Sequence, residues 1–449
     1  YYMKKKILFQ SLGCDKNLVD SEMMLGMLAE NGYAFTDDEN EADAVVVNTC
    51  CFIGDAKEES VNTILEMAEL KKSGRVRALI VTGCLAQRYR EEIRKEIEEV
   101  DAVIGTSAIE ELPAVLDAAF AGKAGDCYHS LEAKPLTGQK RILTTGGHYA
   151  YLKIAEGCDK HCTYCIIPKV RGPYRSVPME SLLREAQALA DQGVKELILV
   201  AQETTVYGQD IYGYKALPAL LERLCRIEGL VWIRILYCYP EEIDDELIRV
   251  MREEEKICHY LDIPVQHASD SVLKRMGRRT DRKELTEIVN KLRREIPDIC
   301  LRTTLIAGFP GETQEDYETL FAFVDETAFD RLGVFPYSQE EDTPAAGMPD
   351  QISDEVKQAR CDELMALQQE IAFEAAADME GRLVKAMIEG KVADEDVYVA
   401  RTYKDAPDVD GYLFVQTKRE LMTGDFVQVR ITGSHEYDLM GELEDESAE

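Results

Sequence analysis

The stretch Tyr151–Cys165 reads YLKIAEGCDKHCTYC and contains the strongest chemical signal in the chain. Its first five residues are typical of a buried strand, and Cys158, Cys162 and Cys165 follow within one short loop. Three thiolates at this spacing can bind three irons of a 4Fe–4S cluster and leave the fourth iron open. An open position is typical of a catalytic metal site. The alternative is a zinc site with His161 as fourth ligand, but four side chains could hardly converge from so short a segment.

This loop belongs to a central α/β unit that we assign to residues 148–374. The strand candidates of this unit are Tyr151–Ala155, Glu196–Val200, Val231–Leu236, Tyr260–Ile263, Cys300–Ile306 and Asp330–Phe335. A helical stretch follows each strand, and the last one runs from about Asp354 to Ala377. Six strand–helix units predict a partial (β/α)6 barrel, open on one side, with its chemistry at the carboxyl ends of the strands.

Residues 1–130 also alternate strands and helices, which predicts an N-terminal open parallel α/β domain. Its strand candidates are Lys6–Gln10, Ala42–Asn48, Arg77–Thr82 and Ala102–Ile104. Residues 131–147 are polar, contain proline and glycine, and are predicted to be a linker. Residues 375–449 contain short strand candidates separated by glycine and aspartate turns, at Leu383–Ile388, Val397–Ala400, Tyr412–Val415 and Phe426–Ile431. This pattern predicts a small C-terminal β-barrel.

A second set of cysteines lies in the N-terminal domain. Cys14, Cys50 and Cys84 each follow the carboxyl end of a predicted parallel strand. Ligands bind at this edge of an open α/β sheet, so the three thiols can converge on a second cluster that also has an open iron. The alternative is three ordinary buried thiols, since free cysteine is commonly a small core residue. Equivalent placement on three successive strands favours the cluster.

Composition narrows the classes of function. The 449 residues include 52 Lys and Arg against 85 Asp and Glu, a net charge of −33, which argues against a chain held to nucleic acid or anionic lipid by bulk positive charge. No apolar stretch approaches the roughly 18 residues of a membrane span. The apolar run Ile7–Phe9 is also too short for a signal peptide, so we expect a cytoplasmic protein. Thirteen cysteines, an odd number, indicate metal or cluster binding rather than a disulfide scaffold.

The cluster loop and its position resemble the radical S-adenosylmethionine (SAM) superfamily, in which the open iron binds SAM. The resemblance implies that Gln202 and Glu203, at the end of the second strand, contact the methionine part of SAM. It also implies that Gly308 and Glu312 belong to the glycine-rich segment near adenosine. Lys169, Arg171 and Arg175 follow the loop and are expected to be solvated surface charges, although they could meet an acidic substrate group.

The two cysteine sets, the partial barrel and the β-rich tail together resemble the methylthiotransferases, which combine an N-terminal cluster domain, a radical-SAM core and a TRAM domain. The resemblance covers essentially the whole chain and implies two 4Fe–4S clusters with SAM. The core cluster would generate the radical, and the N-terminal cluster would carry the sulfur or methylthio group. Cys50 rather than its neighbour Cys51 is chosen as the ligand because its Asn-Thr-Cys context matches the family.

Within the family, Ser11–Glu22 and Gly333–Ala345 resemble the branch that methylthiolates the β-carbon of an aspartate in ribosomal protein S12. Asp15, Cys51 and Asp342 depart from that pattern at turn positions. Residues 374–449 contain 8 Lys and Arg but 19 Asp and Glu, so this domain is expected to attract a basic ribosomal protein rather than RNA or DNA. An electron donor is a further expected partner. The rivals are a tRNA methylthiotransferase, a zinc-stabilised RNA- or protein-binding adaptor without catalysis, and a plain iron–sulfur electron carrier.

Overall fold

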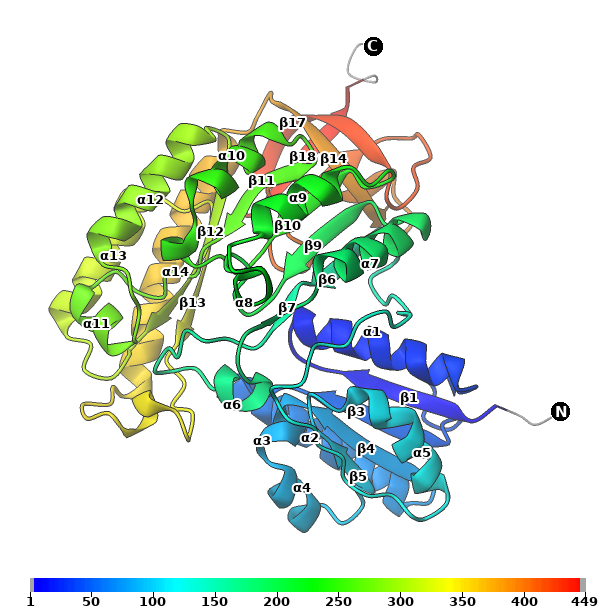
Figure 1. Cartoon of the computed structure of the whole chain (residues 1–449). Coiled ribbons are helices and arrows are strands. Elements are labelled where there is room, and N and C mark those ends of the chain that lie inside the picture. The colour runs from blue at the N-terminus through cyan, green and yellow to red at the C-terminus, as the bar shows by residue number, and fades with distance from the viewer. Residues whose placement is uncertain (1–3, 445–449) are drawn as a thin grey trace.

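The structure is a computed structural model that describes residues 4–444, and it contains three units in contact (Figure 1). In the view of Figure 1 the N-terminal unit lies below the central unit, and the C-terminal barrel lies at the top. Within the described residues, no helix combines the length and the apolar character needed to cross a membrane.

The N-terminal unit is a parallel sheet with strand order β2-β1-β3-β4-β5 and helices on both faces. Its strands are β1 (Lys6–Ser11), β2 (Ala34–Phe35), β3 (Ala44–Thr49), β4 (Ala78–Gly83) and β5 (Ala102–Ile104). Its helices are α1 (Asp15–Glu30), α2 (Gly54–Lys72), α3 (Cys84–Arg88), α4 (Arg90–Glu96), η1 (Ile109–Glu111) and α5 (Leu112–Phe120). β3 is buried along its whole length because successive residues pack on opposite layers. Val46 contacts the α1 and α5 layer and Val45 the α2 and α4 layer, which confirms the predicted open α/β arrangement.

The central unit is a parallel sheet with order β13-β12-β11-β10-β9-β6. Its strands are β6 (Tyr149–Lys153), β9 (Glu196–Val200), β10 (Trp232–Ile235), β11 (Ile257–Asp262), β12 (Cys300–Ala307) and β13 (Arg331–Pro336), with a separate short pair β7 (Ala155–Glu156) and β8 (Arg175–Ser176). Its helices are α6 (Ile167–Arg171), α7 (Met179–Asp191), α8 (Gln209–Tyr212), α9 (Leu217–Cys225), η2 (Pro240–Glu242), α10 (Asp245–Glu253), α11 (Asp270–Arg275), α12 (Arg282–Glu295), α13 (Gln314–Thr327), η3 (Pro344–Gly347) and α14 (Asp354–Ala377). β6 and β13 are the two edges of this sheet, as predicted for a barrel that is open on one side.

The C-terminal unit is a closed barrel with order β14-β15-β16-β18-β17. Its strands are β14 (Leu383–Lys391), β15 (Val397–Thr402), β16 (Leu413–Gln416), β17 (Phe426–His435) and β18 (Asp438–Leu443). β18 was not among the predicted strands, yet it closes the barrel by pairing parallel to β16 and antiparallel to β17. Gly441 permits this closure, because a Cβ there would lie 2.5 Å from Val429 Cγ1.

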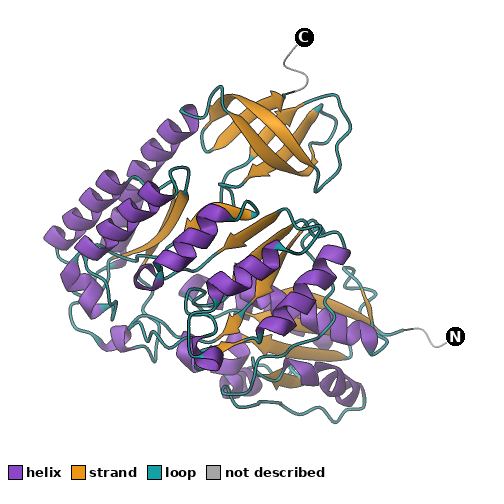
Figure 2. Ribbon diagram, turned by 45° about the horizontal axis from the view of Figure 1, so that its top comes forward, coloured by secondary structure: helices purple, strands orange, loops and turns teal. Residues whose placement is uncertain are grey.

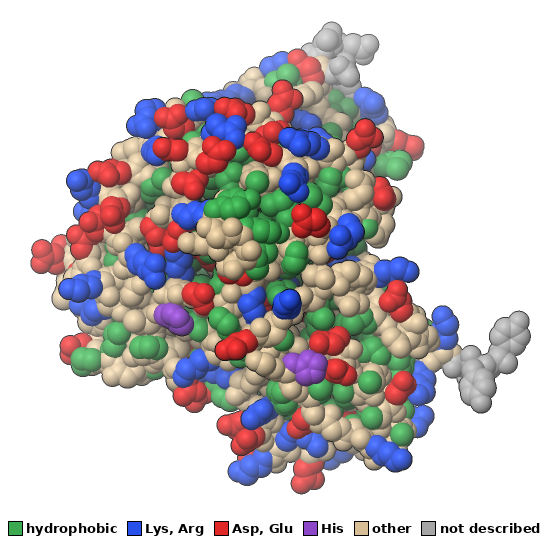
Figure 3. Space-filling model, viewed as in Figure 1, with side chains coloured by type: hydrophobic (Ala, Val, Ile, Leu, Met, Phe, Trp, Pro, Cys, Tyr) green, Lys and Arg blue, Asp and Glu red, His purple; other side chains and the backbone are tan. Residues whose placement is uncertain are grey.

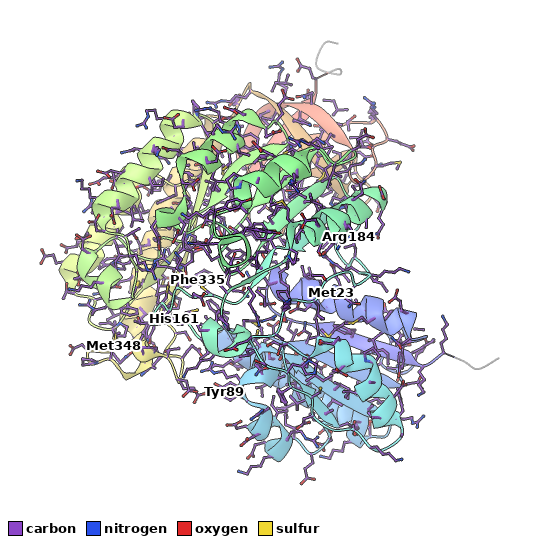
Figure 4. The ribbon with its side chains drawn as sticks, viewed as in Figure 1. Met23, Tyr89, His161, Arg184, Phe335 and Met348 are labelled. Atoms are coloured by element: carbon purple, nitrogen blue, oxygen red, sulfur yellow. The ribbon has the colours of Figure 1, made fainter. Side chains whose placement is uncertain are left out.

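The inner face of the central sheet is covered by the other two units. Met23 of α1, labelled in Figure 4, packs with Tyr151 of the core in one buried cluster, which also includes Met387 of the C-terminal barrel. The rings of Trp232 and Phe426 meet edge to face with centroids 4.8 Å apart. Figure 2 shows the barrel as a compact group of strands beside the core. The interior of the central unit, the partial barrel that is open on one side, is therefore bounded by all three units.

Candidate active site

The loop that carries Cys158, Cys162 and Cys165 is closed at its base. β7 precedes the loop and pairs antiparallel with β8, which follows it. Gly157 has a φ of 79°, and a Cβ there would lie 2.1 Å from Pro173 O, so the strands can approach only with glycine at this position. The pairing of β7 with β8 thus keeps the three thiols together at the carboxyl end of the first core strand.

The thiols of this loop lie beside a buried cation. Cys158 and Cys162 are buried. Arg278 Nη1 lies 3.9 Å from Cys162 Sγ, and Tyr239 Oη lies 3.5 Å from it. Burial raises the pKa of Cys158 to about 12, so metal binding there must displace a proton. His161, labelled in Figure 4, is exposed and does not share this buried setting.

Gln202 and Glu203 lie at the end of β9, next to the same loop. Glu203 Oε1 accepts a hydrogen bond from Thr205 N at 2.8 Å, and Glu203 Oε2 lies 3.7 Å from Lys160 Nζ. Gln202 Nε2 donates to Glu156 Oε1 at 3.1 Å. Among the described residues, Gln202 Oε1 and Glu203 Oε2 are buried oxygens without a hydrogen-bond partner. Two orphaned acceptors beside the thiols fit a polar ligand such as the amino acid part of SAM.

Burial of Glu203 also changes its ionisation. Its side chain is 1% exposed, and this burial raises the pKa to about 7 despite the opposing hydrogen bonds from Thr205 and the charge of Lys160. A carboxyl group with this pKa can be either neutral or charged near neutral pH, which suits contact with an amine.

Gly308 and Glu312 form a structural turn at the end of β12. Glu312 Oε2 accepts hydrogen bonds from the Gly308 and Phe309 amides at 2.9 and 3.2 Å. Arg360 Nη1 lies 2.7 Å from Glu312 Oε1, so both carboxylate oxygens have protein partners. Gly308 has a φ of 74°, and a Cβ there would lie 2.3 Å from Lys357 Cγ. Glu312 therefore supports the turn rather than offering a free ligand atom.

Cys14, Cys50 and Cys84 lie at the carboxyl ends of the adjacent strands β1, β3 and β4. Cys14 is exposed, whereas Cys50 and Cys84 are buried. Gly13 has a φ of 89°, and a Cβ there would lie 2.9 Å from Cys50 Sγ. Burial raises the pKa of Cys84 to about 12 against the opposing charge of Arg171, and the Cys50 and Cys14 thiols raise it further. The structure thus brings the three predicted side chains together.

Cys51 packs in the core of the N-terminal unit, in the same buried cluster as Cys84. It is fully buried and belongs to an apolar cluster with Leu85 and Ile64. Burial raises the pKa of the Cys51 thiol, with the Cys84 thiol adding to the rise and Arg88 opposing it. Cys51 is thus closer to a core residue in character than Cys50 is.

The expectation that Arg171 is a solvated charge was wrong, whereas Lys169 is indeed exposed. Arg171 is 2% exposed, and its Nη1 lies 2.6 Å from Asp20 Oδ2 of α1. No local pattern around Arg171 indicates this burial, because Asp20 lies 151 residues earlier in the chain.

A cavity of about 350 Å³ opens between the three units. Cys14, Tyr237, Asp262 and Arg302 are among its lining residues, together with residues 406–409 of the C-terminal barrel. Tyr237 has a φ of 60°, rare for a residue with a side chain, and its ring lies 3.3 Å below Lys16 Nζ. Arg302 Nη1 lies 3.2 Å from Asp262 Oδ1, and Arg302 is the one cation among the described lining residues.

Within residues 4–444, no group of three or more His, Cys, Asp or Glu side chains is arranged around a single metal-ion position. A 4Fe–4S cluster does not require such convergence, since its cysteines bind separate irons. Cysteine thiolates are the ligands that hold such clusters, so the two cysteine sets have the donor atoms that a cluster needs.

Three family models match successive parts of the chain. They are Uncharacterized protein family UPF0004 over residues 6–105, the Radical SAM superfamily over 152–324 and the TRAM domain over 381–443. The fold and the cysteine loop thus define a radical-SAM enzyme, a class that uses a 4Fe–4S cluster and SAM.

Relatives narrow this class. The chain is 62% identical to the ribosomal protein uS12 methylthiotransferase RimO of Lachnoclostridium phytofermentans, over 98% of this chain and 100% of that protein. It is 50% identical to the protein of the same name from Acetivibrio thermocellus, over 99% of this chain and 100% of the relative. The chain belongs to the RimO family of radical-SAM methylthiotransferases.

Solved structures support the fold alone. The radical SAM methyltransferase TsrM from Kitasatospora setae, with cobalamin and a [4Fe-4S] cluster bound, aligns with a TM-score of 0.55 at 14% identity. The alignment covers 76% of this chain and 74% of that one.

Proposed function

We propose that this chain inserts a methylthio group at the β-carbon of an aspartate in ribosomal protein uS12. One SAM would supply the methyl group and another the radical. The observation that carries the proposal is the pairing of two three-cysteine sets, each at the carboxyl edge of a parallel sheet, within a chain 62% identical to a RimO protein along its length.

Cys158, Cys162 and Cys165 would hold the cluster that binds SAM. When bound, this cluster and SAM supply one-electron chemistry able to break an unactivated carbon–hydrogen bond. Gln202 and Glu203 would present their unpartnered oxygens to SAM, while Gly308 and Glu312 maintain the adjacent turn.

Cys14, Cys50 and Cys84 would hold a second 4Fe–4S cluster. The exposed thiol of Cys14 lies on the wall of the 350 Å³ cavity, so this cluster would face the space between the units. Arg302 would pair with the substrate carboxylate there by exchanging its partners Asp262 and Asp410, since it supplies the positive charge among the described lining residues.

The C-terminal barrel would receive the basic substrate. Some of its carboxylates face inward, as with Asp405 Oδ1, which lies 2.6 Å from Arg331 Nη2 of the core. Residues 394–396 remain exposed and acidic, and they can attract a basic protein. Figure 3 shows acidic and basic side chains interspersed on one face of the molecule. A ribosomal substrate would place the reaction in the cytoplasm, with a separate electron donor.

The closest rival is a tRNA methylthiotransferase, which would bind tRNA tightly and in a salt-sensitive manner. An acidic C-terminal domain opposes that binding. A non-catalytic zinc adaptor would instead yield colourless protein with zinc and without iron.

The decisive experiment combines metal analysis with a modification assay. Anaerobically reconstituted protein should contain about eight irons, and a Cys158→Ala/Cys162→Ala/Cys165→Ala variant about four. Mass spectrometry of recombinant uS12 should show one added methylthio group with the parent protein and none with the variant. Four irons in the parent and none in the variant would eliminate the second cluster, and modification of tRNA alone would reassign the substrate.

A further inference from the structure

Arg171 joins the two halves of the proposed site. It is the last residue of α6, a five-residue helix that begins two residues after Cys165. Its side chain is 2% exposed and crosses from the core into the N-terminal unit. There its Nε donates a hydrogen bond to Cys84 Sγ, with a nitrogen–sulfur distance of 3.2 Å.

The other edges of the guanidinium are fixed by separate partners. Nη1 donates to Asp20 Oδ2 at 2.6 Å and lies 3.3 Å from Glu156 Oε2. Nη2 donates to Asn17 Oδ1 at 2.9 Å. A planar guanidinium held on both terminal nitrogens has little freedom to turn, so its Nε–H is directed at the sulfur.

The carboxylates around Arg171 already have cationic partners, so the contact with sulfur is not needed to pair them. Lys153 forms ion pairs with Asp20 and with Glu156, the latter at 2.7 Å. Two carboxylates therefore face two buried cations, Lys153 and Arg171. The Nε contact is an additional charge-assisted hydrogen bond that the ion pairs do not require.

We propose that Arg171 is a positioning residue that raises the reduction potential of the second cluster through its hydrogen bond to the ligand Cys84. This inference rests on the proposed function, because it requires a cluster on Cys14, Cys50 and Cys84. Hydrogen bonds to ligand sulfurs and nearby positive charge set the potentials of iron–sulfur clusters, and both stabilise the reduced form. Since Arg171 directly follows the radical-cluster loop, it also ties that loop to the second cluster.

The test isolates the second cluster in the Cys158→Ala/Cys162→Ala/Cys165→Ala background of the full chain. An anaerobic redox titration, followed by low-temperature electron paramagnetic resonance of the reduced cluster, gives its potential. Arg171→Gln should move the potential to a more negative value. Arg171→Lys keeps the positive charge but lacks the planar guanidinium. Its cluster potential should lie between that of Arg171→Gln and that of the triple-alanine protein with Arg171 intact.

Arg175→Gln is the matched control. Arg175 follows the same loop, but its guanidinium donates to the carbonyl oxygens of Ala133 and Arg171 at 3.0 and 2.8 Å rather than to sulfur. Its substitution should leave the potential unchanged.

The outcomes separate the two proposals. A background protein without iron would overturn the proposed function itself. A background with about four irons, together with an unchanged potential in Arg171→Gln, would overturn the role of Arg171. If Arg171→Gln fails to assemble the cluster, the potential is measured in Arg171→Lys instead. A potential equal to that of the triple-alanine protein would then refute the proposed effect of Arg171 on the second cluster.

Discussion

Cys50 and Cys51 are adjacent in the chain but lie in different surroundings. Cys50 lies next to Gly13 and its thiol interacts with that of Cys14, whereas Cys51 packs in a buried, mostly apolar cluster that also contains Cys84. In the triple-alanine background, Cys50→Ala should therefore reduce the remaining iron strongly, because it removes a proposed ligand. Cys51→Ala should keep the iron and lose only packing, about 1 kcal/mol of stability. Iron analysis with thermal unfolding checks both, and the reverse pattern would make Cys51 the ligand.

Gly13 controls the spacing of the same site. Gly13→Ala would place a Cβ 2.6 Å from Cys50 Cβ, so we expect loss of iron from the second site with the radical site intact. Gly32→Ala is the matched control, because Gly32 has a φ of 85° but no atom within 4 Å of the added Cβ. Both substitutions should lower stability by about 1–2 kcal/mol, because alanine is disfavoured at a positive φ. Only Gly13→Ala adds a steric clash. Equal iron contents in the two variants would contradict this role of Gly13.

At the scale of elements, local signals were predictable and distant pairings were not. The predicted bounds of β9 and α14 agree with the structure, since each is a run of consistent pattern between clear boundaries. The two-residue strands β7 and β8 have no periodicity to detect. The thiols of Cys158, Cys162 and Cys165 could be grouped because the loop is short. The burial of Arg171 could not be predicted, because it depends on tertiary contacts with α1 and α3.

At the scale of the whole molecule, a buried ion network joins the core to the C-terminal barrel. Glu196 of β9 is 0% exposed, and Arg234 Nε of the core lies 2.7 Å from its Oε1. Arg401 Nη2 of the barrel lies 2.7 Å from Glu196 Oε2. The Glu196 carboxylate thus pairs with two buried guanidiniums from different units, and Glu389 Oε1 of the barrel, 2.6 Å from Arg401 Nε, supplies a second carboxylate to Arg401.

Glu196→Gln should loosen this interface. Burial alone would raise the pKa of Glu196, but Arg401 and Arg234 outweigh burial and hold it below its usual value of 4.5. The stabilisation is therefore complete above about pH 4.5 and is lost as pH falls through the lower folded pKa. Near pH 7 the variant should lose about 3–5 kcal/mol of stability, because the buried Arg234 loses its carboxylate partner and Arg401 keeps only Glu389. The difference in thermal midpoint between wild type and variant should narrow in acid, and amide exchange in β15 should accelerate.

Glu246→Gln, which breaks an exposed pair with Arg249, is the control and should leave both measurements unchanged. Wild-type exchange in β15 of the Glu196→Gln variant would show that the other contacts between core and barrel, such as Arg331–Asp405, hold the barrel without Glu196.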